Sequence, residues 1–317
     1  RARIALAEVI DMHGWQPPKN ARVLDIGAGL GAASLGAAML LREREVCQTV
    51  ELTLLDHSNA ALSQAAALTR ACAAQLPGIA LKKTLTQKLP AFLKNKTRES
   101  ESYDLIIAAF ALNEVWAGYS ARQRAELIKD LSRHLSLTGV LLVLEPALKQ
   151  TALALQQTSD LLAEQNTLSR RGPYAQNFPC PLRAQGKYWA HDVRRWHAPE
   201  SLQHVNRTLW RDVAELKFHW AAWSRTAPPE KNTPTPTMRL CTPFAKLKGR
   251  FEWAGVTLEG QLIRCDLPLR HLDKQTIKKL EHIERGDWLT FSEHETLEPT
   301  RWRIPSPSSL THPYTPV

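Results

Sequence analysis

Three glycines alternate along a short segment, at Gly27, Gly29 and Gly31, directly after an apolar run that ends at Ile26. Glycine lets a backbone turn sharply and pass close to a ligand. The segment from Ala32 onward is rich in helix formers, and a helix N-terminus offers unpaired N–H groups to an anion. The spacing therefore predicts a strand, a loop and a helix that cradle an anionic cofactor. Because Gly27, Gly29 and Ala32 also fit the dinucleotide fingerprint, the glycines alone do not separate NAD from S-adenosylmethionine.

Two acidic residues favour S-adenosylmethionine. Asp25 lies two residues before the first glycine, where class I methyltransferases usually carry an acid that faces the cofactor. Asp56 ends the next apolar run, where a carboxylate can accept hydrogen bonds from both ribose hydroxyls. The alternative role for Asp56 is to cap the following helix, a task that Ser58 can share. An NAD-dependent oxidoreductase remains the alternative. The predicted cofactor residues are Asp25, Gly27, Gly29, Gly31 and Asp56.

Phe110, Asn113 and Glu114 follow the fourth predicted strand, at the sheet edge where ligands of such folds bind. Phe110 can stack on the adenine of the cofactor or wall the methyl-transfer site. Asn113 and Glu114 are the candidate catalytic residues, because their polar groups can orient a substrate. The alternative is that Phe110 is core and that the polar pair begins the next helix. Gln87, after the third strand, can bond the adenine amino group or lie in a solvated loop.

Alternating strand-like and helix-like segments must position these residues. The apolar runs are short and rich in branched residues, as in buried parallel strands. Ser120 and Gln123 have the spacing of a capping box. The alternation predicts an α/β fold, a Rossmann-like sheet of the class I methyltransferase type. Strands are expected at 22–26, 50–55, 80–85, 103–109 and 140–144, and helices at 32–41, 59–74, 120–135 and 150–164.

The pattern changes after residue 169, which indicates further parts of the chain. A Pro/Arg/Trp-rich insert with closing elements of the core, including a late strand over 209–223, follows the core. A linker rich in proline and threonine comes next. A small β-containing module follows, with a hairpin over 250–267 that turns at Gly255 or Gly260 and a basic helix over 274–285. A Pro/Ser/Thr-rich tail is expected to be flexible. The predicted boundaries are 1–169, 170–226, 227–237, 238–298 and 299–317.

The charge of +10 at pH 7 favours anionic partners, and nucleic acid is the commonest of them. The alternative is a solvated surface that happens to be basic. Five cysteines, an odd number spread widely, do not indicate a disulfide framework. No run is long and apolar enough for a membrane helix, and no secretory leader is evident. We therefore expect a monomer from a reducing compartment without membrane association.

Several groups of residues together carry a resemblance to a known family. They are Leu24–Gly29, Tyr103–Ala108 with Leu112–Glu114, Leu142–Pro146, Pro179–Leu182 with Trp189–His191, Trp223–Arg225, Lys248–Arg250 and Arg285–Trp288. In this order they resemble the methyltransferase-like proteins of the mitochondrial small ribosomal subunit and their bacterial relatives. The likeness covers nearly the whole chain. The glycine loop is shared by many methyltransferases, whereas the segment around Cys180 and the Gly-Asp-Trp ending are more specific.

The resemblance implies a protein that acts on small-subunit ribosomal RNA or on the assembling small subunit. Such a protein is either an S-adenosylmethionine-dependent methyltransferase or a non-catalytic assembly and RNA-binding factor that keeps the cofactor fold. It implies a role in translation, in the bacterial cytoplasm or alternatively the mitochondrial matrix.

Typical members of that family also hold an iron–sulfur cluster through four cysteines. In this chain Tyr174 and Ala190 stand at two of the expected cysteine positions, and only Cys180 stands at another. We therefore predict that no iron–sulfur cluster is present. Cys180, His191 and Cys241 are the remaining metal candidates, too few for a closed four-ligand site.

Basic and aromatic residues interleave around the cysteine segment, a mixture that neutralises phosphates and offers stacking faces. The predicted RNA-binding residues are Arg194, Arg195, Lys246 and Lys248. Further basic and aromatic members of the same pattern are Arg170, Arg171, Arg183, Lys187, Tyr188, Trp189 and Trp196, with Lys274, Lys278 and Lys279 in the C-terminal module.

Overall fold

The computed structural model describes residues 1–94, 101–174, 178–186, 189–211, 213–228, 235–270 and 272–314. The chain forms two compact units, each described by itself. The first contains the described residues of Arg1–Pro179 and Trp220–Glu230, and the second contains those of Cys180–His219 and Lys231–Thr315. No helix among the described residues is long and apolar enough to cross a membrane.

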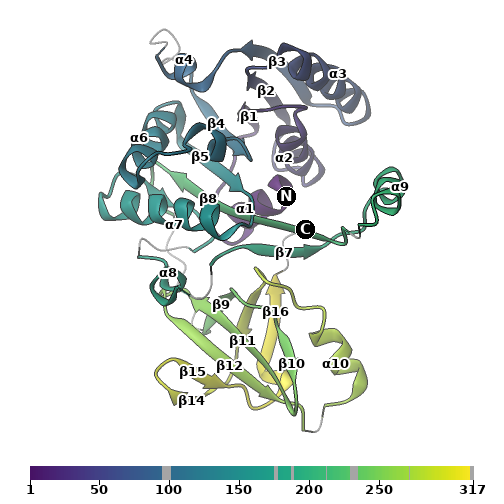
Figure 1. Ribbon diagram of the computed structural model, residues 1–317, viewed down its shortest axis with the longest axis vertical. Helices are drawn as coiled ribbons and strands as arrows, with labels where there is room; N and C mark the ends of the chain where they lie inside the picture. The colour runs from purple at the N-terminus through teal and green to yellow at the C-terminus, as the bar shows by residue number, and fades with distance from the viewer. Residues whose placement is uncertain are drawn as a thin grey trace. The chain divides into compact units, whose positions relative to one another are not determined.

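A mostly parallel sheet forms the centre of the first unit (Figure 1). Its strands are β1 (Asn20–Ile26), β2 (Thr49–Asp56), β3 (Ile79–Thr86), β4 (Tyr103–Ala109), β5 (Leu135–Glu145), β6 (Ser169–Arg170) and the later part of β8 (Glu215–Ser224). The strand order is β3-β2-β1-β4-β5-β8-β6. The pairs from β3 to β5 are parallel, whereas β6 and β8 are antiparallel. Chain order reverses between β1 and β4, and ligands bind at such switch points.

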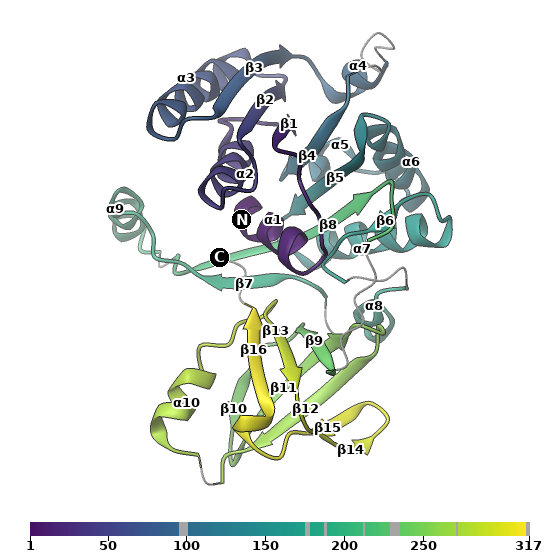
Figure 2. The ribbon, with the colours of Figure 1, turned by 180° about the vertical axis from the view of Figure 1, so that it is seen from behind.

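Seven helices are described in the first unit. They are α1 (Ala2–Asp11), α2 (Ala32–Glu43), α3 (Asn59–Gln75), α4 (Leu89–Lys94), α5 (Leu112–Val115), α6 (Ala121–Ser132) and α7 (Lys149–Glu164). Helices α1, α2 and α3 lie on one side of the sheet, and α6 and α7 lie on the other (Figures 1 and 2). The predicted capping box is present, because the Ser120 hydroxyl accepts from the Gln123 N–H and the Gln123 side chain reaches back to the Ser120 N–H.

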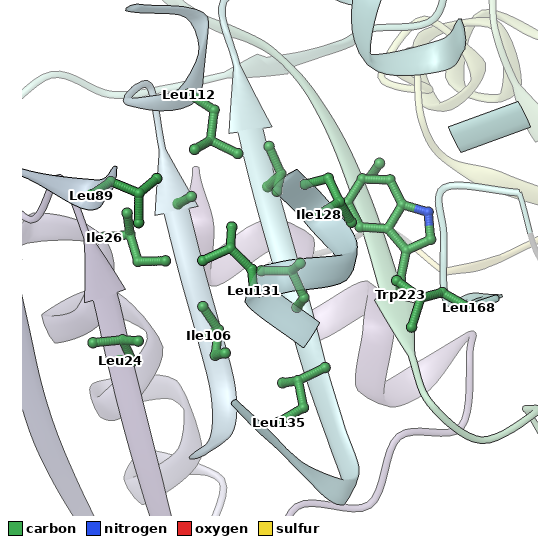
Figure 3. Close-up of a cluster of buried hydrophobic side chains, with 14 of the residues drawn as sticks. Leu24, Ile26, Leu89, Ile106, Leu112, Ile128, Leu131, Leu135, Leu168 and Trp223 are labelled. Atoms are coloured by element: carbon green, nitrogen blue, oxygen red, sulfur yellow. The ribbon is translucent and has the colours of Figure 1, made fainter. Parts of the chain in front are cut away.

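The buried core between the sheet and helices α6 and α7 holds β1, β4 and β8 in place (Figure 3). Leu24 and Ile106 contribute from neighbouring strands, and Ile128 and Leu131 contribute from one face of α6. Trp223 of β8 closes the cluster and is only 1% exposed. The late strand predicted over 209–223 is therefore present, but it begins at Glu215. Leu209 instead forms the C-cap of helix α9 (Glu200–Thr208).

The second unit is mostly β-structure, as predicted for the C-terminal module. Its large sheet has the order β14-β15-β12-β11-β9-β13-β16, with β10 on β11, and β7 pairs antiparallel with the first half of β8. The strands are β7 (Asp192–Arg195), β9 (Thr237–Leu240), β10 (Ala245–Leu247), β11 (Arg250–Thr257), β12 (Leu262–Pro268), β13 (Trp288–Phe291), β14 (Glu295–Glu298), β15 (Arg301–Arg303) and β16 (Leu310–Tyr314). The described helices are α8 (Pro181–Gln185), α9, α10 (Lys274–Leu280) and the 3₁₀ turn η2 (Pro307–Ser309).

The hairpin predicted over 250–267 is confirmed as the antiparallel pair β11 and β12. Gly260 lies in its turn with a φ of +83°. Gly255 does not, because it pairs with Ile263 inside the ladder. Close packing requires glycine at position 255 instead, since a Cβ there would lie 2.7 Å from Met238 Sδ. The basic helix ends at Leu280, five residues earlier than predicted.

The prediction of a flexible tail over 299–317 is wrong. It contains β15, which pairs in parallel with β12, and β16, which pairs with β13. The proline- and serine-rich composition misled the prediction, because these short strands join the sheet through backbone hydrogen bonds and β16 lies at its edge, where polar residues and proline are tolerated. In the predicted linker over 227–237, residues 229–234 lie outside the described residues, and Thr237 already begins β9.

Candidate cofactor-binding site

The glycine loop leaves β1 after Ile26 and enters α2 at Ala32, as its sequence predicts. All three glycines have positive φ, from +53° to +77°. Gly27 is the most constrained of them, because a Cβ on it would lie 2.4 Å from Ala111 Cβ. Only glycine therefore fits where this loop passes the segment that follows β4.

Asp56 holds the glycine loop against the end of β2. Its Oδ2 accepts the Gly29 N–H at 2.9 Å, and its Oδ1 accepts the Ser58 N–H at 2.8 Å. Ser58, and not Asp56, caps α3, because its hydroxyl accepts the Ala61 N–H at 3.2 Å. Each carboxylate oxygen has a second lone pair, and Asp56 also lines the adjoining pocket. The residue can thus fix the loop and still accept hydrogen bonds from a ligand.

Asp25 lies beneath the loop and does not line the pocket. It is 1% exposed, and its Oδ2 accepts the Ser34 N–H at 3.1 Å in the first turn of α2. Burial raises the pKa of this carboxyl to about 6, and the nearby Asp56 charge adds a smaller increase. Asp25 therefore orients the start of α2 beneath the glycine loop, a role that the sequence pattern did not distinguish from direct contact.

A pocket of about 660 Å³ opens at the carboxyl ends of the central strands. Its lining includes Gly27 and Asp56 from the two loops already described, and Gln87, Phe110 and Glu114 from the loops after β3 and β4. The sequence analysis named all five, and the structure brings them together. It missed several other lining residues, because they lie in loops or short helices without a recognisable spacing: His57, Lys88, Pro90, Ala111, Val115 and Tyr119.

Gln87 lines this pocket and carries an unsatisfied polar group. Its backbone N–H donates to the Asp56 carbonyl oxygen at 2.9 Å, which fixes the residue beside β2. Its side-chain Nε2 is buried and makes no hydrogen bond in the described protein. A buried donor without a partner costs free energy, so a ligand that supplies an acceptor there gains stabilisation.

Replacing Gln87 with leucine is expected to weaken binding of S-adenosylhomocysteine by about tenfold, because one hydrogen bond to the ligand is lost. Isothermal titration calorimetry measures this change directly. The thermal stability of the free protein should be unchanged or higher, since the variant removes an unsatisfied donor. Binding equal to that of the wild type would show that Gln87 does not contact the cofactor.

Phe110 and Asn113 form a clamp with the buried Glu145 at the end of β5. Glu145 is 0% exposed, and its Oε1 accepts the Asn113 N–H at 3.0 Å. In the orientation that satisfies its neighbours, the Asn113 side-chain nitrogen donates to the Phe110 carbonyl oxygen and to Glu145 Oε2, each at 3.1 Å. Phe110 has a φ of +60°, which is strained for an aromatic residue. The clamp holds Phe110 in this conformation at the pocket wall.

The two candidate catalytic residues therefore have different positions. Asn113 is turned toward Glu145 and does not line the pocket, so its role is to position the loop. Glu114 is exposed and lines the pocket, where its carboxylate can reach a bound substrate. Phe110 is part of the pocket wall, and the Arg1 guanidinium carbon lies 5.3 Å from its ring centre. Glu145 could have been singled out from the sequence as the acid that ends the fifth strand.

Glu145 gives the protein an unusual dependence of stability on pH. Burial raises the pKa of its carboxyl from 4.5 to about 8, with a smaller increase from the Glu114 charge. Between these values the folded protein retains a proton that the unfolded chain releases. The contribution of this group to stability is therefore complete below about pH 4.5 and is lost as pH rises through 8.

A Glu145→Gln variant should remove this component, because the amide does not titrate. We expect the free energy of unfolding to fall less steeply from pH 5 to pH 8 in the variant, by at most about 1.4 kcal/mol per pH unit. Urea unfolding at several pH values gives both slopes, and Glu164→Gln, at an exposed carboxylate of α7, is the matched control. Equal slopes in the Glu145→Gln variant and the wild type would contradict the assignment.

The three metal candidates do not form a metal site in the described part of the chain, where no group of three or more suitable ligands occurs. Burial raises the pKa of the Cys241 thiol to about 12, and its Sγ donates to the Ala254 carbonyl oxygen at 3.2 Å. Cys180 is buried as well. His191 stacks on Trp189, and burial, with the Arg285 charge, lowers its pKa to about 4.

The predicted RNA-binding residues do not all lie on the surface. Arg194 is 3% exposed and forms an ion pair with Asp287, so its assignment to RNA is wrong. Its guanidinium is needed to neutralise a buried carboxylate. Arg195 and Lys246 are exposed but engaged, Arg195 with the Glu281 carbonyl oxygen and Lys246 with the Glu281 carboxylate. Lys248 is exposed.

The same correction applies to two further arginines of that pattern. Arg170 pairs with Asp160, and Arg171 donates to the Ser224 hydroxyl, both in buried surroundings. Lys187 and Tyr188 lie outside the described residues.

Comparison with known proteins identifies the domain. A family model described as a methyltransferase domain matches residues 17–204, more than half of the chain. The chain belongs to this methyltransferase family. This membership confirms the predicted fold class, and S-adenosylmethionine is the cofactor of this class I fold. None of the curated proteins matches the sequence.

The chain is similar to several solved structures of methyltransferases. Precorrin-6y C5,15-methyltransferase from Geobacter metallireducens is 10% identical over 71% of this chain and 87% of that chain, with a TM-score of 0.39. An S-adenosylmethionine-dependent methyltransferase from Thiobacillus denitrificans, in complex with S-adenosylhomocysteine, is 16% identical over 71% and 91% of the two chains, with a TM-score of 0.38.

The residues of the pocket fit S-adenosylmethionine. Gly27 brings the loop backbone to the pocket wall without a side chain, and Asp56 offers acceptors to ribose hydroxyls. The buried Gln87 Nε2 requires an acceptor, and a ring nitrogen of adenine can supply one. When bound, S-adenosylmethionine supplies a methyl group made electrophilic by its sulfonium. The protein's own residues then have to orient the acceptor and exclude competing water.

Proposed function

We propose that this protein methylates a nucleobase of small-subunit ribosomal RNA. One observation supports this most directly: the pocket brings the rings of Phe110 and Tyr119 together with the carboxylate of Glu114. A planar acceptor suits such surroundings, because enzymes that modify a base hold it between aromatic or apolar side chains and read its polar edge. The resemblance of ordered segments to ribosomal methyltransferase-like proteins supports the choice of RNA.

Each pocket residue has a defined task in this proposal. Phe110 and Tyr119 pack against the base and limit its tilt. Glu114 accepts a hydrogen bond from the exocyclic group of the base and takes the proton that the nucleophile loses on methylation. The clamp of Asn113 and Glu145 fixes Phe110, which keeps the acceptor in line with the methyl donor.

The charge of the whole protein agrees with a polyanionic partner. The chain carries 41 Lys and Arg against 31 Asp and Glu. Several arginines that the sequence suggested for RNA binding are engaged in buried ion pairs or hydrogen bonds, namely Arg170, Arg171 and Arg194. The RNA must therefore be held by other basic residues. The small ribosomal subunit, free or assembling, is the partner that we propose.

Mapping of modified nucleotides in small-subunit RNA tests the proposal. RNA is compared from cells with the gene, without it, and complemented with wild type or with a folded variant that cannot bind the cofactor. A methyl group that is lost without the gene and restored only by the wild type would support the enzyme. Normal methylation with defective subunit assembly, rescued by both proteins, would overturn it in favour of a non-catalytic assembly factor.

A further inference from the structure

A second cavity, of about 590 Å³, lies in the second unit between the hairpin of β11 and β12 and the hairpin of β14 and β15. The alternation of the strands explains its polarity. Phe251 and Trp253 of β11 point into the apolar core of the unit, so the intervening Glu252 faces the cavity. On β12, Ile263 belongs to the core in the same way, and Arg264 faces the cavity.

Two arginines stand side by side in this cavity. Arg264 of β12 and Arg301 of β15 are register partners in a parallel pair, and both line the cavity. Like charges directly opposite each other on neighbouring strands are destabilising. A sheet that keeps such a pair has either an internal counter-charge for both residues or an anionic ligand.

Of these two arginines, only Arg301 lies near a buried carboxylate, that of Asp266. Asp266 is 3% exposed, and its Oδ2 accepts from Arg303 Nε at 3.0 Å. Its Oδ1 lies 3.6 Å from Arg301 Nη2, beyond hydrogen-bond distance. One carboxylate is therefore shared between two guanidinium groups. Arg264 is exposed, and its side chain makes no hydrogen bond or ion pair within the described residues.

The other charged residues of the cavity do not compensate Arg264. Arg250 and Glu252 pair with each other at 2.9 Å. Glu298 is exposed and lines the cavity on β14. Three arginines and three carboxylates line the cavity, and Arg303 from outside the lining also uses Asp266. Arg264 is therefore left without an ion pair in the described residues.

We propose that this cavity is a phosphate site, in which Arg264 and Arg301 hold a phosphodiester of single-stranded RNA. Guanidinium groups present planar pairs of N–H donors that match phosphate oxygens. None of the described lining residues is aromatic, so the cavity has no ring on which to stack a base. That favours a backbone phosphate of a longer strand over a free nucleotide. The choice of RNA rests on the proposed function, whereas the anion site rests on the arginine pair alone.

An Arg264→Glu variant of the full chain tests the site. Its affinity for a fluorescently labelled single-stranded fragment of small-subunit RNA is measured by anisotropy across salt concentrations. We expect affinity to fall by about tenfold or more at low salt, and the slope of log K against log salt to fall by roughly one. Arg270→Glu, an equal charge change at an exposed residue outside the cavity, should change affinity by less than about twofold.

Further measurements separate the possible failures. Both variants must be at least as thermally stable as the wild type and must keep its binding of S-adenosylhomocysteine, which shows that the fold is intact. RNA affinity and salt slope unchanged in Arg264→Glu, with the wild type binding RNA, would overturn the phosphate site and leave the proposed function standing. A wild type without salt-dependent RNA binding would overturn the proposed function and the RNA assignment together.

Adenosine monophosphate and inorganic phosphate, titrated at millimolar concentration into the wild type and Arg264→Glu, distinguish a free ligand from a strand. Binding of either that is abolished by the substitution, while RNA affinity stays unchanged, would overturn the RNA assignment in favour of a free anion. RNA binding that is lost in Arg264→Glu, and only weakly inhibited by either small anion in the wild type, would support the proposal.

Discussion

Gly27→Ala is expected to weaken S-adenosylhomocysteine binding by about a hundredfold, equivalent to ~2.7 kcal/mol. The added Cβ would lie 2.4 Å from Ala111 Cβ, and the residue would have to keep a φ of +64°. The loop after β1 and the loop after β4 must then separate, and both line the cofactor pocket. Isothermal titration calorimetry with the purified variant measures the loss.

Gly36→Ala is the matched control for this substitution. Gly36 lies in α2, close to the same loop, but its φ is not positive and an added Cβ would come no nearer than 3.9 Å to Arg3 Cβ. Alanine is also the better helix former, so the control should be as stable as the wild type or slightly more stable. Equal cofactor affinity in the two alanine variants would show that Gly27 is not part of the binding site.

Asp287→Ala should lower the free energy of unfolding by about 3–5 kcal/mol, because it leaves the Arg194 charge buried without its closest partner. Asp287 is 0% exposed, and besides Arg194 it accepts the Glu284 N–H at 2.8 Å. The nearest other carboxylate oxygens lie 4.0 Å from the Arg194 guanidinium, at Asp192 and Glu284. Urea denaturation followed by tryptophan fluorescence measures the change.

Glu281→Ala is the corresponding surface control. It removes the exposed partner of Lys246 and should cost no more than about 1 kcal/mol. A loss for Asp287→Ala as small as that of the control would mean that the Arg194 pair contributes little to the second unit. In that case Arg194 would again be a candidate for RNA contact.

The local pattern of residues predicted the cofactor half of the protein well. The apolar strands and the capping box of Ser120 depend on interactions between near neighbours in the chain, so their spacing is informative. Gly27 was found from its place between a strand and a helix, although the contact that requires it, with Ala111, is distant in sequence. Asp56 needed only the rule that ligands bind at the carboxyl ends of parallel strands. The sequence placed Asp25 correctly beside the glycine loop but did not predict that its carboxylate accepts the Ser34 N–H. A sequence does not show which way a carboxylate turns beneath a loop.

The second unit was harder to predict because its decisive contacts join distant residues. Arg194 finds Asp287 across 93 positions of sequence, so a basic residue that looked available for RNA is buried. Arg264 and Arg301 meet only because β12 and β15 pair in parallel. The strands after residue 299 have few apolar residues, and their membership of the sheet depends on backbone hydrogen bonds that composition does not reveal.

The most direct test of the account is a calorimetric titration of the wild-type protein with S-adenosylhomocysteine, with NAD titrated in parallel. The pocket formed by Gly27, Asp56 and Gln87 predicts one molecule of S-adenosylhomocysteine bound per chain, with a dissociation constant in the micromolar range or below, about −8 kcal/mol. NAD should not bind under the same conditions. No heat from S-adenosylhomocysteine at millimolar ligand, or saturable binding of NAD instead, would contradict the assignment of this pocket.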